Sequence, residues 1–229
     1  MGAAPLSAQH AVGRLPGLKE PALVHGPDST LWLIWLEQRP QERGRTTALI
    51  RRFGDSEAEP QELTPAPSNL RSRVHDYGGG ALATAVEQDR LILAWIEGGC
   101  LWRQDWRLPQ TSTHQPTPLT AAKRLSREGD WELADGVLDL PMQRWIGIRE
   151  IEGRDELASL ALSGTDQTPL LLHQPTDFAG YGCLSPDGHR FAWVEWQQPA
   201  MPWDSSSLWC AEFSDTGTVS YTHLTLPTT

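Results

Sequence analysis

Four apolar stretches recur along the chain and resemble one another. They are TLWLIWLEQ (30–38), RLILAWIEGG (90–99), RWIGIREIEG (144–153) and RFAWVEWQ (190–197). Each is short, rich in β-branched and aromatic residues and bounded by polar or turn residues, which predicts a buried β-strand and not a helix. Their repetition predicts one structural unit that is used four times.

Further apolar stretches flank each of these predicted strands. A strand is predicted before each one, over PALVHG, GGALATAVE, WELADGVLDL and YGCLSPDG. Another is predicted after each one, over TTALIRRF, CLWRQDW, ELASLAL and SLWCAEF. A weaker stretch closes three of the units, as QELTPA, PTPLTAA and TPLLLHQ. Units of four short strands that repeat about every 45 to 60 residues are typical of a β-propeller, in which each unit is one blade.

We therefore predict an all-β fold, a partial β-propeller of about three and a half four-stranded blades. Residues 1–19 are predicted to be an N-terminal extension, residues 20–213 the propeller and residues 214–229 a non-native tail. The blades are expected over about 20–67, 74–122, 131–174 and 179–213. We expect a truncated chain, because a propeller ring closes to remove exposed sheet edges.

The last ten residues, SYTHLTLPTT, depart from the repeat where the fourth strand of the last blade is expected. They resemble the translation of a sequencing adapter, which is the basis for the predicted non-native tail. Alternatively, Tyr221, His223 and Thr225 alternate with their neighbours at period two, a pattern that favours an edge strand. Both interpretations stay open at this point.

Charge and composition narrow the classes of function. The formal net charge is −10, which argues against a nucleic-acid surface, because phosphate binding needs a clustered positive field. No apolar run is long enough for a signal peptide or a membrane span, so we expect a soluble, cytoplasmic protein without a membrane partner. Cys100, Cys183 and Cys210 are far apart and form no C-x-x-C pair, and we expect reduced thiols in the core.

The segment RSRVHDYGGGALATA (71–85) places three glycines between a basic run and a row of small residues. Neither G-x-G-x-x-G nor G-x-x-x-x-G-K-[ST] is present, so a phosphate-binding loop is not favoured. Gly78, Gly79 and Gly80 are predicted to open the first strand of the second blade, close to the propeller axis. Neighbouring blades crowd there, and glycine allows close backbone approach and positive φ.

Upstream of the glycines, Arg71, Arg73 and His75 share one face if the segment is extended, because side chains alternate with period two. One interpretation is a solvated or ion-paired edge. The other is a basic patch at the inner channel or at a contact with another domain.

Three segments together resemble a known family. SNLRSRVHDYGGGA (68–81), LIWLEQRPQERGRTTAL (33–49) and SPDGHRFAWVEWQQPAMPWDSSSLW (185–209) are similar to the N-terminal propeller of bacterial prolyl oligopeptidase family members described as dipeptidyl aminopeptidase or acylaminoacyl-peptidase. The most specific block is W-x-x-P-x-M-P-W-D at 196–204. Asp76 stands where the family usually has Glu.

The resemblance implies a seven-bladed propeller followed by a C-terminal α/β-hydrolase domain that carries the serine, aspartate and histidine of a serine peptidase. No G-x-S-x-G nucleophile elbow exists in this chain, so we assign no catalytic residue, and His75 and His189 lack a nucleophile in a plausible setting. The implied partners are the chain's own hydrolase domain and short peptide substrates, to which the propeller limits access. The alternative is a free-standing propeller that binds peptides or proteins without catalysis.

Two other constellations remain. We expect no metal or other cofactor, because no H-E-x-x-H or C-x-x-C motif is present. Trp203 and Asp204 lie in a loop that is predicted to face the next blade or the hydrolase domain. A carbohydrate-active propeller would pair acids such as Glu37, Glu150 or Glu195 with tryptophans. Inter-blade packing explains the tryptophans better, because most fall in the repeated strand: Trp32, Trp35, Trp95, Trp145, Trp193 and Trp196.

Overall fold

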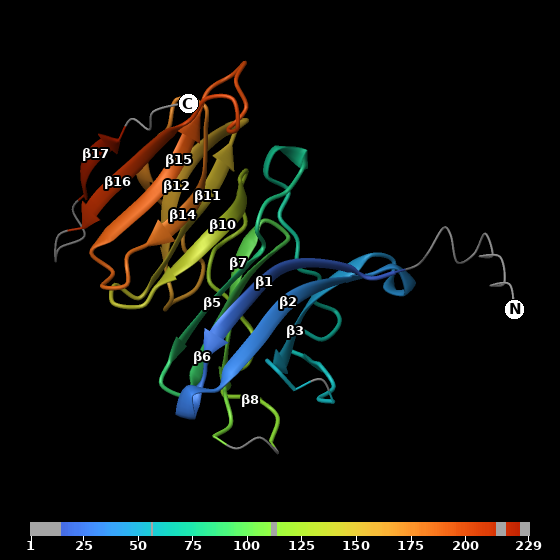
Figure 1. The fold of residues 1–229 in the computed structure, drawn as a ribbon. Helices are drawn as coiled ribbons and strands as arrows, with labels where there is room; N and C mark the ends of the chain where they lie inside the picture. The colour runs from blue at the N-terminus through green and yellow to red at the C-terminus, as the bar shows by residue number, and fades with distance from the viewer. Residues whose placement is uncertain (1–14, 56, 111–113, 214–218, 225–229) are drawn as a thin grey trace, which may run out of the picture.

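A computed structural model describes residues 15–55, 57–110, 114–213 and 219–224, and these form four antiparallel sheets in chain order (Figure 1). We call these sheets blades 1 to 4. Blade 1 contains β1 (Gly17–His25), β2 (Leu31–Arg39), β3 (Arg45–Arg52) and β4 (Gln61–Glu62). Blade 2 contains β5 (Leu82–Glu87), β6 (Arg90–Glu97), β7 (Cys100–Arg107) and β8 (Thr117–Pro118), with β9 (Lys123–Arg124) also paired to β7.

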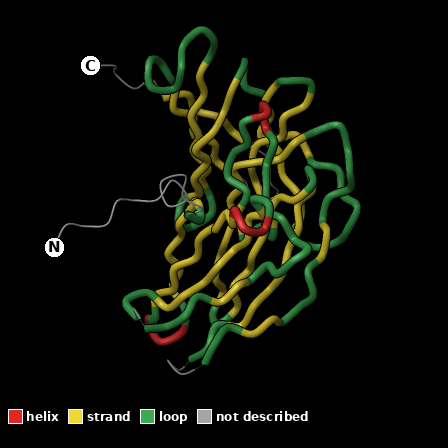
Figure 2. Tube along the Cα trace, turned by 90° about the vertical axis from the view of Figure 1, so that its right-hand side faces the viewer, coloured by secondary structure: helices red, strands yellow, loops and turns green. Residues whose placement is uncertain are grey.

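The last two blades repeat this order. Blade 3 contains β10 (Glu132–Asp139), β11 (Arg144–Ile151), β12 (Arg154–Ala161) and β13 (Leu170–His173). Blade 4 contains β14 (Phe178–Leu184), β15 (Arg190–Trp196), β16 (Ser207–Phe213) and β17 (Val219–Leu224). The helical segments of the described residues are three short 3₁₀ turns, drawn in red in Figure 2: η1 (Pro27–Ser29), η2 (Pro40–Glu42) and η3 (Val74–Asp76).

The predicted all-β fold of a partial propeller is confirmed. Each of the four repeated stretches forms the second strand of a blade, and the stretches on either side form the first and third strands. Blade 4 also has a fourth strand, because β17 pairs along β16. Residues 219–224 therefore adopt the edge-strand pairing that we gave as the alternative for the tail. At the other end, β1 begins at Gly17, inside the segment expected to be an extension.

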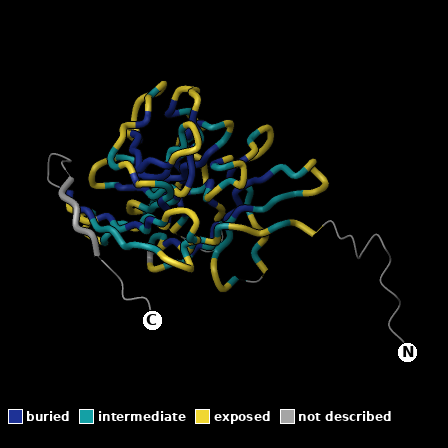
Figure 3. Tube along the Cα trace, turned by 90° about the horizontal axis from the view of Figure 1, so that it is seen from above, coloured by how far each residue is buried: buried dark blue, intermediate teal, exposed yellow. Residues whose placement is uncertain are grey.

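The blades pack face to face, and the buried segments lie in the middle of the molecule (Figure 3). One apolar cluster joins blades 1, 2 and 3, and a second joins blades 3 and 4. Blade 2 lies between two neighbours, so every residue from Leu91 to Ile96 is buried. In blade 1, by contrast, burial alternates along β2, because only one face of this sheet is covered.

The motif W-x-E recurs in the second strand of three blades, and the burial of its tryptophan depends on whether a neighbouring blade covers that face. It occurs in blade 1 as Trp35 and Glu37, in blade 2 as Trp95 and Glu97, and in blade 4 as Trp193 and Glu195. Trp95 and Trp193 are each 1% exposed within the inter-blade clusters. Trp35 lies on the uncovered face of blade 1, where it lines an apolar cavity of 560 Å³ with Leu33 and Leu18. The tryptophan of the motif therefore packs on the preceding blade where one is present.

The expectation for the cysteines is only partly correct. All three are free, and Cys100 is buried, but Cys183 is exposed and Cys210 is partly buried. In the pairing register, Cys183 lies opposite Ala192, which in turn lies opposite Cys210. The two thiols thus share the face of blade 4 that points away from blade 3, and no described blade covers it.

None of the described helices is long and apolar enough to span a membrane.

Candidate functional site

The glycine-rich start of blade 2 is held from both sides by carboxylates. The backbone N–H of Gly80 donates to Asp135 Oδ1 of blade 3 at 2.6 Å. The N–H groups of Ala81 and Leu82 donate to Glu20 Oε2 of blade 1, each at 2.9 Å. Three consecutive backbone donors are therefore satisfied by neighbouring blades.

The close approach explains the need for glycine. A Cβ at Gly79 would lie 2.7 Å from Ala134 Cβ, and a Cβ at Gly80 would lie 2.8 Å from Asp135 Oδ1. Gly78 has φ +84, a conformation that L side chains rarely adopt. The predicted close packing of the glycines is confirmed, but they precede the strand that they were expected to open, because β5 begins at Leu82.

The first strands of three blades share a bulge that the sequence did not reveal. The register shifts between Lys19 and Ala22 in β1, and the equivalent shifts occur in β10 and β14. Each bulge holds one residue at positive φ: Glu20, Asp135 and Tyr181. The only signal in the sequence is the proline or glycine that follows each of them, since such a residue is common at bulges.

These bulges line a cavity of 500 Å³ between the first strands of the four blades. Its walls include the carboxyl groups of Glu20 and Asp135 and the rings of Tyr181 and Trp196. Burial raises the pKa of Glu20, as does the charge of Asp135, while the hydrogen bonds from blade 2 oppose this change. The inner channel is therefore acidic and aromatic.

His75 lies in η3 and has φ 50, so the extended arrangement that would align it with Arg71 and Arg73 is not formed. The segment forms a turn here, and contacts with blade 3 hold this turn. The backbone N–H of His75 donates to Glu150 Oε2 at 2.5 Å, and the ring Nε2 lies 2.7 Å from Asp155 Oδ1. The ring of His75 thus lies within hydrogen-bond distance of a carboxylate of blade 3.

The carboxylate of Asp155 connects three parts of the chain. It is 3% exposed, and its second oxygen accepts the N–H of Ala179 in blade 4 at 3.0 Å. The ring of Phe178 in blade 4 also contacts His75 edge-on, with centroids 5.1 Å apart. Asp155 and His75 together tie the segment before blade 2 to blades 3 and 4.

The other predicted residues lie at one end of the blades. In an antiparallel blade, the start of the first strand and the loop after the second strand lie at the same end. The segment before β5 and the loop 197–206 after β15 therefore share this end. We call its exposed side chains the linker face: Arg71, Arg73, Tyr77, Met201 and Trp203. Arg71 also lines a polar cavity of 370 Å³ with Lys19 and Arg43.

Asp204 supports the turn that carries Trp203. Its carboxylate accepts the N–H of Met201 at 3.1 Å, and its own N–H donates to the Met201 carbonyl at 2.9 Å. This turn holds the Trp203 ring in solvent, 77% exposed. Tyr77 is 97% exposed at the same end.

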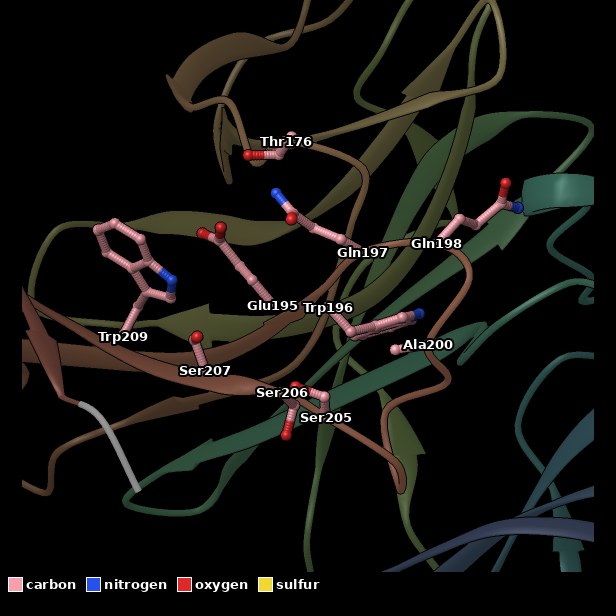
Figure 4. Close-up of a pocket in the computed structure, with 10 residues that line it drawn as sticks. All are labelled: Thr176, Glu195, Trp196, Gln197, Gln198, Ala200, Ser205, Ser206, Ser207 and Trp209. Atoms are coloured by element: carbon pink, nitrogen blue, oxygen red, sulfur yellow. The ribbon is translucent and has the colours of Figure 1, made fainter. Parts of the chain in front are cut away.

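A second polar cavity of 370 Å³ lies beneath the loop 197–206 (Figure 4). Glu195 and Gln197 point to the same side of β15, toward Thr176, and Trp209 lies beside Glu195. The remaining lining residues are Trp196, Gln198, Ala200, Ser205, Ser206 and Ser207. Sequence reasoning singled out the loop but not this cavity.

In the part of the chain that the structure describes, no group of three or more His, Cys, Asp or Glu residues is arranged to hold a metal ion.

Comparisons with known proteins agree with this architecture. A puromycin-hydrolyzing peptidase of Mycobacterium tuberculosis is 26% identical, with a TM-score of 0.74 over 97% of this chain and 33% of its own. A puromycin hydrolase is 25% identical, with a TM-score of 0.72 over 96% of this chain and 34% of its own. TolB from Acinetobacter baumannii shares the fold alone, at 14% identity and a TM-score of 0.55. No family model and no curated protein sequence matches.

The chain spans about a third of the length of the two peptidases that it matches. The resemblance to the propeller of a peptidase, which the sequence motifs indicated, is thereby confirmed.

Proposed function

The chain is similar to the N-terminal propeller of prolyl oligopeptidase family peptidases, and from this premise we propose that it controls which peptides reach the catalytic residues of a serine peptidase. The observation that carries the proposal is the match of nearly the whole chain to one third of a peptidase. The catalytic serine, histidine and aspartate would belong to an α/β-hydrolase domain outside this sequence. That domain would hydrolyse the peptide through an acyl-enzyme.

The linker face is the surface that we assign to contact with this domain. Its two aromatic side chains, Tyr77 and Trp203, are both largely in solvent. Exposed aromatic residues beside arginines are typical of protein interfaces, in which Tyr, Trp and Arg are enriched. Arg71, Arg73 and Trp203 would then serve as inter-domain contacts, with Asp204 as the support of Trp203.

The substrates would be short peptides, because a propeller over an active site excludes larger chains. The acidic, aromatic channel would be one place where they pass. We further propose that this peptidase acts in the cytoplasm, as a dipeptidyl aminopeptidase or an acylaminoacyl-peptidase.

We expect Trp203→Ala, in a peptidase that contains this propeller, to weaken discrimination against long peptides. The ratio of kcat/KM for a tripeptide to that for a peptide of about thirty residues would fall by about tenfold, since one aromatic contact at an interface contributes 1–2 kcal/mol or more. Steady-state kinetics on both peptides measures this ratio.

Phe53→Ala is the matched control, because Phe53 is 53% exposed but follows the third strand of blade 1, at the opposite end of the blades. An unchanged ratio in Trp203→Ala, or an equal change in both variants, would count against the linker face as the gate.

A further inference from the structure

The W-x-E motif of blade 4 departs from that of blade 2 in one respect. In blade 2, both oxygens of Glu97 are bonded: Oε1 accepts the N–H of Asn69 at 2.8 Å and Oε2 accepts Trp95 Nε1 at 3.2 Å. One oxygen of this carboxylate therefore holds the segment before blade 2, and the other holds Trp95 within the blade.

In blade 4, a single oxygen of the motif's glutamate contacts both neighbouring groups. Glu195 Oε1 accepts Trp193 Nε1 at 2.7 Å and lies 2.7 Å from His173 Nε2 of blade 3. Oε2 has no hydrogen-bond partner among the described residues, although Glu195 is only 9% exposed. Oε2 is not among the buried atoms that lack a partner, so it is open to the cavity and can accept a hydrogen bond from a ligand.

The connection after the motif also differs. Blade 2 joins its second and third strands by the tight turn Gly98–Gly99, and blade 3 uses the turn 152–153. Blade 4 replaces this turn with the loop 197–206, and the cavity of 370 Å³ opens beneath that loop. Asp177 fixes the start of the loop, because its Oδ2 accepts the N–H of Gln198 at 3.0 Å.

The chemistry of the cavity wall is specific. Among the described residues that line the cavity, Glu195 is the single charged one, and none is basic. Beside it lie the Gln197 amide, the hydroxyl group of Ser207 and the indole of Trp209, and Ser206 lies farther from it in the cavity lining (Figure 4). The cavity therefore offers one carboxylate, several neutral acceptors and flat aromatic walls.

We propose that this cavity binds the guanidinium group of a peptide arginine. A planar, weakly hydrated cation suits a carboxylate beside an indole ring better than a compact ammonium ion does. Glu195 Oε2 accepts an N–H of the guanidinium, and the Gln197 and serine oxygens accept others. The inference stands apart from the proposed peptidase function, since binding is measured on this chain alone.

The test is calorimetric titration of the 229-residue chain with N-acetyl-arginine amide and with N-acetyl-citrulline amide, its neutral isostere. We expect the citrulline compound to bind at least about tenfold more weakly, because the charge-assisted hydrogen bond is lost. N-acetyl-lysine amide is expected to bind with intermediate affinity.

Two variants locate the site. Glu195→Gln should weaken arginine binding at least about tenfold, and Ser206→Leu, which fills the cavity without touching the carboxylate, should abolish it. Glu212→Gln is the matched control, because Glu212 belongs to the same blade but its side chain is 65% exposed in an ion pair with Arg190. Thermal melts establish that each variant is folded.

Equal binding of arginine and citrulline compounds would overturn the proposal. So would unchanged arginine affinity in the folded Ser206→Leu variant, or no binding to the parent chain at about 10 mM ligand, above the millimolar range of weak specific sites.

Discussion

Replacing Asp155 by alanine is expected to lower the free energy of unfolding by about 3 kcal/mol, since two buried or half-buried donors lose their acceptor at once. Those donors are the ring of His75 and the N–H of Ala179. Asp155→Asn retains an acceptor oxygen and should cost about 1 kcal/mol. Denaturant unfolding followed by tryptophan fluorescence measures both values.

The control for Asp155 is Glu128→Ala, because the Glu128 side chain is 80% exposed and makes one surface ion pair with Arg124. It should change stability by less than about 0.5 kcal/mol. Equal losses of unfolding free energy in the Asp155 and Glu128 variants would show that the buried hydrogen bonds of Asp155 stabilise the blades no more than a surface ion pair does.

The same carboxyl group predicts a pH dependence. Burial raises the pKa of Asp155, although the bonds from Ala179 and His75 oppose this change. The native state thus holds the proton more tightly than the unfolded chain does, between the ordinary carboxyl pKa and the raised value. The stability contributed by this proton is present below that range and is lost as the pH rises through it. Asp155→Asn removes this component, so its unfolding free energy should vary less with pH there.

Trp95→Ala is expected to destabilise the chain by about 3–5 kcal/mol, because a fully buried indole is lost between two blades. The matched variant is Trp35→Ala, the same position of the W-x-E motif in blade 1. Its ring lies on the face that no described blade covers, so its loss should cost less than about 2 kcal/mol. The difference measures what a neighbouring blade adds to one side chain.

Chemical denaturation at a single protein concentration measures the free energy of unfolding of both tryptophan variants. Sedimentation measures whether they associate. Equal costs would mean that the Trp35 face is covered in solution, for example by a second copy of the chain. That result would contradict a free face on blade 1.

The fold was predictable because each blade depends on local patterns. Strand doublets carry alternating or continuous apolar residues, and short turns such as Ser185–Gly188 separate them. The bulges at Glu20 and Asp135 were not predictable, because they arise from packing between blades and leave only a following proline or glycine. The pairing of β17 was left open for a similar reason, since two interpretations fitted the same alternating residues.

The site was less predictable than the fold. The family-like blocks pointed to the loop with Trp203 and to the segment with His75, and both lie at one end of the blades. Extended geometry was wrong for His75, because contacts with Glu150 and Asp155 from blade 3 bend its segment into a turn. The cavity at Glu195 depends on the path of the loop 197–206, and the open Oε2 depends on both donors bonding Oε1; no sequence pattern specifies either.

The central claim is that this propeller serves a peptidase, and the most direct measurement is resequencing of the source DNA across the codons for residues 214–229 and beyond them. Our account predicts a reading frame that continues through further four-stranded repeats into a G-x-S-x-G segment followed by an aspartate and a histidine. A stop codon directly after residue 229 would contradict it, and the chain would then be a free-standing propeller that binds peptides or proteins.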